Sequence, residues 1–157
     1  MEWSALKLFV TVGTTPFNSL VSAVDNCELE AFDTVLVQHA KGNASKKYES
    51  KIFINDIQTA YLEADIVLTH AGAGSIYRLL ELGKKIVVVP NLERVDPHQT
   101  QIAKYVEENQ YGLVCWRLGE LASILTKAVD FYPVDYEPTL FFKTPELIEL
   151  IQKEYLD

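Results

Sequence analysis

The sequence predicts an α/β protein, a single domain in which helices cover both faces of a parallel β-sheet. Along almost the whole chain, short apolar runs rich in β-branched residues alternate with segments of helical periodicity. The runs are continuously apolar, which is typical of parallel strands buried on both faces. A length of 157 residues suffices for one domain with one sizeable core.

Six apolar runs are predicted to form strands. The loop Gly13–Pro16 closes the first run, the polar segment Lys41–Lys47 separates the second from the third, and Pro90 stops the fifth. The predicted strands are Leu6–Val12, Thr34–Gln38, Lys51–Ile54, Ile66–Thr69, Lys85–Val89 and Leu113–Trp116.

Helices are expected between the strands from local start and stop signals. Asp56 can cap a helix, Gly83 suits the left-handed residue after a helix, and Pro97 suits a first helical position. The predicted helices are Phe17–Asn26, a helix from Asp56 to Ala64, Ser75–Leu82, Asp96–Asn109, Leu118–Val129 and Thr144–Tyr155.

The segment Asp130–Lys143 contains Pro133 and Pro138 and has no clear periodicity, so it is predicted to be an extended crossing segment. It is rich in aromatic residues, most of which are expected to complete the core of the domain. Because aromatic residues are also enriched at interface centres, residues from about 130 to 157 are a candidate surface for docking a partner.

Composition excludes several classes of protein. A formal charge of −8 argues against nucleic acid as the partner, because such proteins concentrate Lys and Arg. Two cysteines are too few for a disulfide framework, which favours a reducing, cytoplasmic setting. The start of the chain lacks a signal-peptide pattern, and no apolar stretch is long enough to span a membrane. Any membrane association is therefore expected to be indirect.

The most informative segment is His70-Ala71-Gly72-Ala73-Gly74-Ser75, between a predicted strand and a predicted helix. Glycines let a ligand approach the backbone, and the amide groups and positive end of a helix attract phosphate. Ser75 can cap the helix or contact an anion. The segment therefore predicts a diphosphate site, and the alternative is a tight turn that needs glycine for packing. A dinucleotide fingerprint is excluded because Tyr77 replaces its third glycine, and no P-loop is present.

Other polar groups follow predicted strands and should share the same edge of the sheet. Thr14 and Thr15 either contact phosphate or cap the next helix. Asp96 and Gln99 resemble a capping box, while His98 and Gln99 at a helix start can also read sugar hydroxyls.

The histidines of the chain modestly favour a ligand site at this edge. His39 and His70 each follow a predicted strand and are candidate cleft residues, although a lone histidine is often only hydrogen-bonded within the fold. No spacing of ligands suggests a metal site, and no nucleophile elbow is present.

Three stretches, LFVTVGTTPF, ADIVLTHAGAGSIYRLLELGKKIVVVPN and DPHQTQIA, resemble the donor-binding, carboxyl-terminal half of family-28-type glycosyltransferases. The similarity covers about Leu8–Leu113 and extends to stand-alone members, which are subunits of two-chain transferases for dolichol-linked oligosaccharide and bacterial exopolysaccharide. The resemblance implies a Rossmann-like domain equivalent to the C-terminal half of a GT-B enzyme. It also implies inverting transfer from a UDP-sugar, with no metal or other cofactor in the donor site.

The resemblance also implies roles for particular residues. Ile54 would meet uracil through its backbone, and His98 and Gln99 would face the donor sugar. The diphosphate would be bound by Thr14, Thr15, Gly72, Ala73, Gly74 and Ser75. Relatives commonly carry an acidic residue at position 78 that binds ribose hydroxyls, whereas this chain has Arg78. Either Glu81, on the same helix face, takes over the ribose contact, or Arg78 contacts phosphate.

The predicted function is that of the donor-binding catalytic subunit of a two-chain glycosyltransferase. It would move a hexosyl or N-acetylhexosaminyl group from a UDP-sugar to a lipid-linked saccharide. A membrane-associated, acceptor-binding subunit would supply the missing half and hold the chain at the cytoplasmic side of a membrane. The general base is not identified. A non-catalytic accessory subunit that binds nucleotide sugar is the alternative, and a two-domain sugar-nucleotide epimerase is a weaker one.

Overall fold

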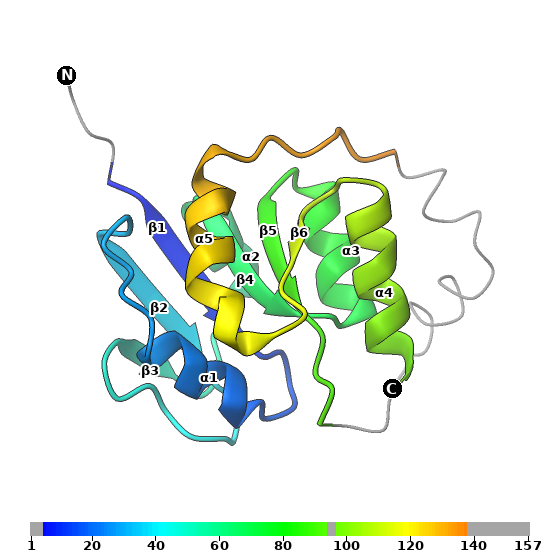
Figure 1. Ribbon diagram of the computed structural model, residues 1–157. Helices are drawn as coiled ribbons and strands as arrows, with labels where there is room; N and C mark the ends of the chain where they lie inside the picture. Colours follow the sequence, from blue (N-terminus) through cyan, green and yellow to red (C-terminus); the bar gives the residue numbers. More distant parts are fainter. Residues whose placement is uncertain (1–4, 94–96, 138–157) are drawn as a thin grey trace.

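The computed structural model of the chain describes residues 5–93 and 97–137. Their six strands form one parallel sheet in the order β3-β2-β1-β4-β5-β6 (Figure 1). The strands are β1 (Lys7–Thr11), β2 (Thr34–Gln38), β3 (Glu49–Lys51), β4 (Ile66–His70), β5 (Lys85–Val89) and β6 (Leu113–Val114). The helices are α1 (Asn18–Asp25), α2 (Ile57–Glu63), α3 (Ala73–Glu81), α4 (Pro97–Glu108) and α5 (Leu121–Asp130), with a 3₁₀ turn, η1 (Leu118–Glu120), before α5.

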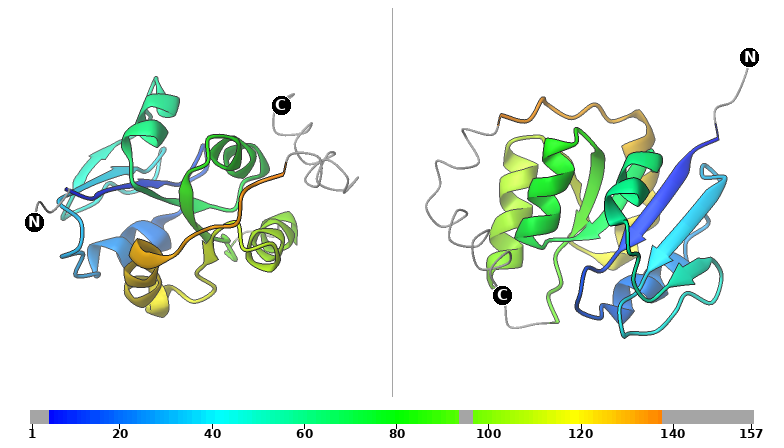
Figure 2. Two further views of the ribbon diagram at one scale, coloured as in Figure 1. Left: turned by 90° about the horizontal axis from the view of Figure 1, so that it is seen from above. Right: turned by 180° about the vertical axis from the view of Figure 1, so that it is seen from behind.

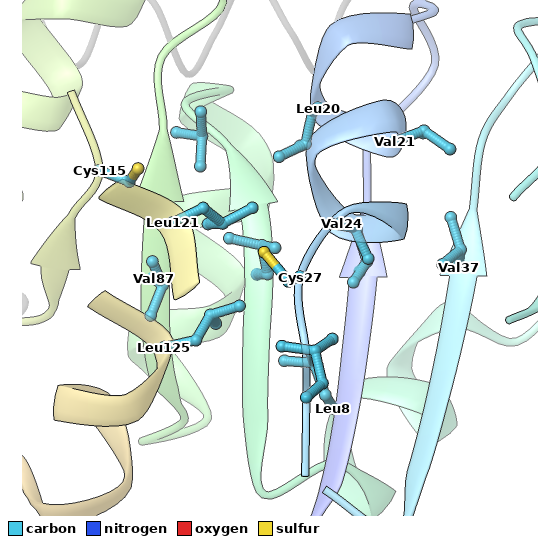
Figure 3. Close-up of a cluster of buried hydrophobic side chains, with 14 of the residues drawn as sticks. Leu8, Leu20, Val21, Val24, Cys27, Val37, Val87, Cys115, Leu121 and Leu125 are labelled. Atoms are coloured by element: carbon cyan, nitrogen blue, oxygen red, sulfur yellow. The ribbon is translucent and has the colours of Figure 1, made fainter. Parts of the chain in front are cut away.

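Helices cover both faces of the sheet, so the predicted α/β fold is confirmed. α1 and α5 lie on one face, and α2 and α3 lie on the other (Figure 2). On the first face, Leu20 and Val24 of α1 share a core with Leu121 and Leu125 of α5 and with Leu8 of β1 (Figure 3). A second core joins α2, α3 and α4. Because successive side chains of a strand point to opposite faces, the central strands contribute to both cores.

The order of the strands reverses between β1 and β4. The chain moves outward from β1 to β2 and β3, and then returns through α2 to pair β4 with the other side of β1. Open α/β sheets bind their ligands at such a switch point, outside the carboxyl ends of the strands. The loops that follow β1 and β4 are therefore neighbours at the edge where a ligand is expected.

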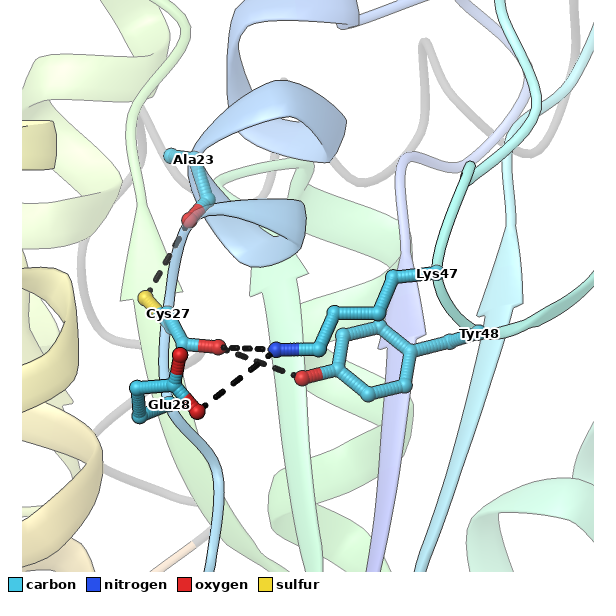
Figure 4. A network of polar contacts seen from close by, with 5 residues as sticks. All are labelled: Ala23, Cys27, Glu28, Lys47 and Tyr48. Atoms are coloured by element: carbon cyan, nitrogen blue, oxygen red, sulfur yellow. Dashed lines mark hydrogen bonds and ion pairs between the residues drawn. The ribbon is translucent and has the colours of Figure 1, made fainter.

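The parallel strands β2 and β3 are joined by a loop rather than a helix. Lys47 Nζ and the Tyr48 hydroxyl each donate a hydrogen bond of 3.2 Å to the carbonyl oxygen of Cys27, just after α1 (Figure 4). Lys47 Nζ also lies 3.8 Å from a carboxylate oxygen of Glu28, and the Cys27 thiol donates to the carbonyl of Ala23. These contacts fix where β3 begins, and with it the position of the loop after β3.

The third strand is Glu49–Lys51, and the prediction of a strand at Lys51–Ile54 is wrong. Pairing with β2 sets its bounds, because Leu36 aligns with Glu49 and Gln38, the last residue of β2, aligns with Lys51. Beyond Lys51 one further backbone hydrogen bond, from the Ala40 N–H to the carbonyl of Ile52 at 2.9 Å, precedes the turn away from the sheet. The apolar residues that suggested a strand there instead lie in a loop at the carboxyl edge of the sheet.

Most of the other elements differ from the predictions by one to three residues at an end, and the structure gives the reason in two cases. α3 begins at Ala73 rather than Ser75, because Gly72 is extended and its carbonyl accepts the first helical hydrogen bond, from the Ile76 N–H, at 3.0 Å. β6 is Leu113–Val114 rather than Leu113–Trp116, since a single further ladder bond, from the Cys115 N–H to the carbonyl of Val88, precedes the turn away from the sheet.

Residues 131–137 follow α5 without helix or strand. The Val134 N–H donates to the carbonyl of Gln110 at 2.9 Å, and the ring of Tyr136 meets that of Tyr111 edge-on, with centroids 5.5 Å apart. The predicted helix Thr144–Tyr155 and most of the candidate docking surface lie outside the described residues. In residues 5–93 and 97–137, no helix has the length and apolar character needed to cross a membrane.

Candidate functional site

A cavity of about 390 Å³ lies at the carboxyl ends of β1, β2, β3 and β4, beside the switch point of the sheet. The loops after β1 and β3 and the beginnings of α2 and α3 surround it. The residues that line it are Gly13, Thr14, Gln38, Phe53, Ile54, Ile57, Tyr61, Gly74, Ser75 and Arg78.

The cavity brings together five of the residues predicted from the sequence, namely Thr14, Ile54, Gly74, Ser75 and Arg78. Three sequence-distant segments contribute them, so the fold supplies the convergence that a ligand site requires. The other predicted residues lie outside this lining: they are Thr15, His39, His70, Gly72, Ala73, Glu81, His98 and Gln99.

One end of the cavity is formed by the first turn of α3. The first N–H groups of a helix have no acceptor inside the helix, and they point out of its N-terminal end together with the positive end of the helix dipole. In α3 these positions include Gly74 and Ser75, which line the cavity. The prediction that Ser75 caps the helix is wrong, because Gly72 is the capping residue and no side chain completes the cap.

The loop after β1 faces α3 across the same end of the cavity. Gly13 has a φ of +74°, a conformation that side chains rarely adopt, and its N–H donates to Oγ1 of Thr11 at 3.1 Å. The residue before α1 is Phe17, and no side chain caps that helix. The alternative in which Thr14 or Thr15 caps α1 is therefore wrong, and Thr14 instead lines the cavity.

The side chain of His70 packs against both the loop after β1 and the loop after β4. A β-carbon at Gly72 would overlap Nε2 of its imidazole, and a β-carbon at Gly13 would lie 2.5 Å from Cε1. The ring therefore occupies space that side chains at either glycine would need. Both glycines serve close packing here, so the packing alternative for the glycine segment holds for Gly72. The diphosphate site stays a prediction.

Gln38 is a lining residue that sequence reasoning missed. Its side chain is 2% exposed, and Nε2 donates to the carbonyl oxygens of Gly13 at 2.9 Å and Ile52 at 2.8 Å, while Oε1 accepts from Oγ1 of Thr11 at 2.5 Å. One amide group thus holds the loop after β1 and the loop after β3 in place. The available signal was a polar residue at the end of an otherwise apolar strand.

The opposite end of the cavity is apolar and is built from Phe53, Ile54, Ile57 and Tyr61. Asp56 caps α2 as predicted. Its carboxylate accepts hydrogen bonds from the Thr59 N–H at 3.1 Å and from the Thr59 hydroxyl at 2.6 Å. These hydrogen bonds from Thr59 lower the pKa of Asp56. The cap fixes the first turn of α2, which presents Ile57 to the cavity.

Arg78 contributes the only charge among the described residues that line the cavity. It lies on α3, one turn beyond Ser75, and its Nη1 donates to Oε1 of Gln58 on α2 at 3.2 Å. Glu81, the other candidate ribose ligand, is exposed and lies outside the lining.

Gln99 and the histidines make contacts within the fold. Gln99 is buried, and its Oε1 accepts from the N–H groups of Asn91 at 2.8 Å and Ala71 at 3.4 Å. It thereby ties the loop after β5 to the loop after β4. His98 Nδ1 lies 3.4 Å from Oε1 of Gln101, and His39 Nδ1 lies 3.1 Å from the carbonyl oxygen of Gly42. Asp96, the other half of the predicted capping box, is outside the described residues.

Residues 7–130 match the model of the glycosyltransferase family 28 C-terminal domain. The chain belongs to this family. The match spans all six strands and α1 to α5, so the cavity described above lies in a family 28 domain. Among the residues that the structure describes, no cluster of three or more His, Cys, Asp and Glu side chains could hold a metal ion.

Curated relatives agree with the family. The chain is 32% identical over 123 residues to the mouse (Mus musculus) UDP-N-acetylglucosamine transferase subunit ALG13, which corresponds to 69% of this chain and 10% of the mouse protein. It is 30% identical over 125 residues to the subunit of the same name from Yarrowia lipolytica, covering 69% of this chain and 64% of that protein. The chain thus spans about a tenth of the first relative and just under two thirds of the second.

Solved structures share the fold of this family 28 domain. The crystal structure of Acinetobacter baumannii MurG superposes with a TM-score of 0.66 at 22% identity, over 82% of this chain and 42% of that one. The chain is therefore similar in fold to one half of a GT-B glycosyltransferase.

Proposed function

We propose that this chain binds a UDP-sugar in the cavity and is the donor-binding catalytic subunit of a two-chain inverting glycosyltransferase. Membership of family 28 supports a transferase. The observation that carries the finer proposal is the cavity itself, which joins an amide-rich helix start, at Gly74 and Ser75, to an apolar end, at Ile54. These two ends match the two halves of a nucleoside diphosphate.

In this proposal, the N-terminal amides of α3 and the Thr14 hydroxyl bind the diphosphate, with Thr15, Gly72 and Ala73 shaping the loops around it. The backbone of Ile54 meets uracil, and His98 and Gln99 face the sugar. An acceptor hydroxyl attacks C1 of the sugar, the bond from C1 to the diphosphate oxygen breaks, and UDP leaves. Amides at a helix start stabilise the negative charge that develops on the departing oxygen. The hydroxyl proton goes to a base that belongs to the acceptor side.

A partner is part of the proposal. The chain covers 42% of the MurG structure, and the ALG13 relatives are described as subunits. Three large apolar side chains are exposed in loops at the cavity's edge of the sheet: Ile52 (55% exposed), Phe53 (48%) and Leu92 (61%). Such groups suit contact with a second polypeptide. We propose a membrane-associated subunit that binds a lipid-linked saccharide acceptor and holds this chain at the cytoplasmic side, without a metal in the donor site.

Arg78 supports a second candidate function. The family resemblance implies an acidic ribose ligand at this position, and a cation there changes the ribose end of the cavity. A non-catalytic subunit that binds a nucleotide sugar without transferring it would tolerate this change.

Calorimetric titration of the chain with UDP, GDP and their sugars tests donor binding. We expect UDP and one UDP-sugar to bind more tightly than GDP. Gly74→Val should abolish binding, whereas Gly119→Val should not, because Gly119 is exposed and nothing lies within 4 Å of a β-carbon there. Equal binding by the two variants would contradict the diphosphate site.

Transfer of radiolabelled sugar to a lipid-linked acceptor, measured with and without the acceptor-binding subunit, separates the two candidates. A catalytic subunit gives transfer only when the pair is complete, and Gly74→Val lowers turnover by roughly 10²- to 10³-fold. Donor binding without transfer in the complete pair would favour the accessory function.

A further inference from the structure

We propose that Arg78 supplies the positive charge of the diphosphate site by contacting the phosphate next to the ribose. Because of this cation, the cavity binds nucleoside diphosphates in preference to nucleosides. This inference rests on the proposed function, since it concerns the same cavity. It assigns to Arg78 a role opposite to that of an acidic ribose ligand.

The position of Arg78 on α3 is the first support. Arg78 lies three residues after Ser75, and residues with this spacing lie on the same face of a helix. Both side chains line the cavity, and Arg78 is partly buried there. The guanidinium therefore extends the amide-rich helix start with a full positive charge, one turn further along α3.

The charge balance of the cavity is the second support. Apart from Arg78, the described residues of the lining are glycines, apolar residues and neutral polar residues, without a carboxylate among them. The chain as a whole carries a formal charge of −8, which opposes the approach of an anion. Among the lining residues that the structure describes, Arg78 is the one side chain able to neutralise a bound diphosphate. Charged hydrogen bonds are about twice as strong as neutral ones.

The contact with Gln58 is the third support. A guanidinium carries five N–H donors in a rigid, planar arrangement, and Oε1 of Gln58 accepts from Nη1 at 3.2 Å. This bond directs the guanidinium toward α2, whose residues Ile57 and Tyr61 also line the cavity. A nucleotide that spans both ends of the cavity places its ribose and first phosphate between them.

The test compares uridine, UMP and UDP as ligands of the wild-type chain and of Arg78→Gln by titration calorimetry. We expect Arg78→Gln to weaken the binding of UDP and UMP by about 10- to 100-fold, because the lost interaction is with phosphate. The affinity for uridine should stay within about 2-fold of the wild-type value. UDP binding should also become less sensitive to salt in this variant. Arg78→Lys keeps the charge with a different donor geometry and should fall between the two.

Lys104→Gln is the matched control. It removes the same unit of charge from an exposed position on α4, outside the cavity, and should bind all three ligands like the wild type. Circular dichroism and urea unfolding of each variant show whether it is folded before its affinity is compared.

Two results would overturn the inference. The first is unchanged UDP affinity in a folded Arg78→Gln variant, and the second is an equal loss for UDP and uridine, which would place Arg78 on the base or ribose. Failure of the proposed function looks different: the wild-type chain would then bind no UDP, and both proposals would fall. If the wild type binds UDP and Gly74→Val does not, the proposed diphosphate site stands whatever Arg78→Gln does.

Discussion

The imidazole of His70 lies where a side chain at Gly13 would be, since a β-carbon there would come within 2.5 Å of Cε1. The same ring also packs against Gly72, which lies in the loop after β4. One histidine is thus packed against both loops that form the amide-rich end of the cavity. The spacing of these loops, and therefore the geometry of the proposed diphosphate site, depends on the absence of side chains at two positions.

Gly13→Ala should destabilise the protein more than Gly83→Ala does. Both glycines have positive φ, +74° and +67°, so that alanine costs about 1–2 kcal/mol at either position from backbone strain alone. Nothing lies within 4 Å of a β-carbon at Gly83, whereas one at Gly13 meets His70. Urea unfolding measures the difference, and UDP titration should show weakened binding only for Gly13→Ala.

Combining Gly13→Ala with His70→Ala serves as the control. Removing the ring should recover the part of the loss that comes from the overlap and leave the part that comes from φ. If Gly13→Ala and Gly83→Ala cost the same free energy of unfolding, the packing of His70 against the loop is unimportant.

Gln38→Leu should lower the free energy of unfolding by about 2–4 kcal/mol, because the carbonyls of Gly13 and Ile52 lose a buried donor. Nucleotide affinity should fall as well, since both carbonyls belong to loops that form the cavity. Thr34→Val, at the exposed beginning of the same strand, is the matched control and should change neither quantity. A Gln38→Leu variant as stable as the wild type would mean that the two loops are held by other contacts.

The central elements of this fold could be predicted because their signals are local. Continuous apolar runs fixed β2 and β5 to the residue, and the chemistry of single positions identified Asp56 as a helix cap and Gly83 as a left-handed residue. The convergence of Thr14 and Ser75 was also predictable in outline, because parallel strands place their following loops at one edge of the sheet. The prediction for Ile54 came from the family resemblance.

Other features depend on partners that the local sequence does not reveal. Glu49–Lys51 is a polar edge strand whose bounds come from its register with β2, so an apolar pattern could not identify it. The start of α3 follows from the extended backbone of Gly72 rather than from a capping side chain. Likewise, the role of Gln38 requires two loops that lie 25 and 14 residues away in the sequence.

Gln99→Leu distinguishes an anchor between loops from a sugar ligand. Its Oε1 accepts from the N–H groups of Asn91 and Ala71, and leucine would leave both buried donors without this acceptor, at a cost of about 2 kcal/mol in unfolding free energy. Gln101→Leu, on an exposed position of the same helix, should be neutral. A variant with wild-type stability but a raised KM for the UDP-sugar would assign Gln99 to the sugar alone.

Both cysteines should be unreactive in the folded protein. Cys115 is 1% exposed and its thiol donates to the carbonyl of Arg117, and burial raises its pKa from 9.0 to about 11. Burial also raises the pKa of Cys27. Because the thiolate is the reactive form, we expect a disulfide reagent at pH 8 to modify both thiols only as fast as the chain unfolds.

The raised pKa of Cys115 also predicts how stability depends on pH. The unfolded chain gives up the thiol proton near pH 9, whereas the folded protein holds it until about pH 11. The contribution of this group is therefore complete below pH 9 and is lost progressively as the pH rises toward 11. Urea unfolding between pH 8 and pH 10 should show a smaller loss for Cys115→Ala than for the wild type. Equal slopes in the two proteins would mean that Cys115 titrates alike in the folded and unfolded chains.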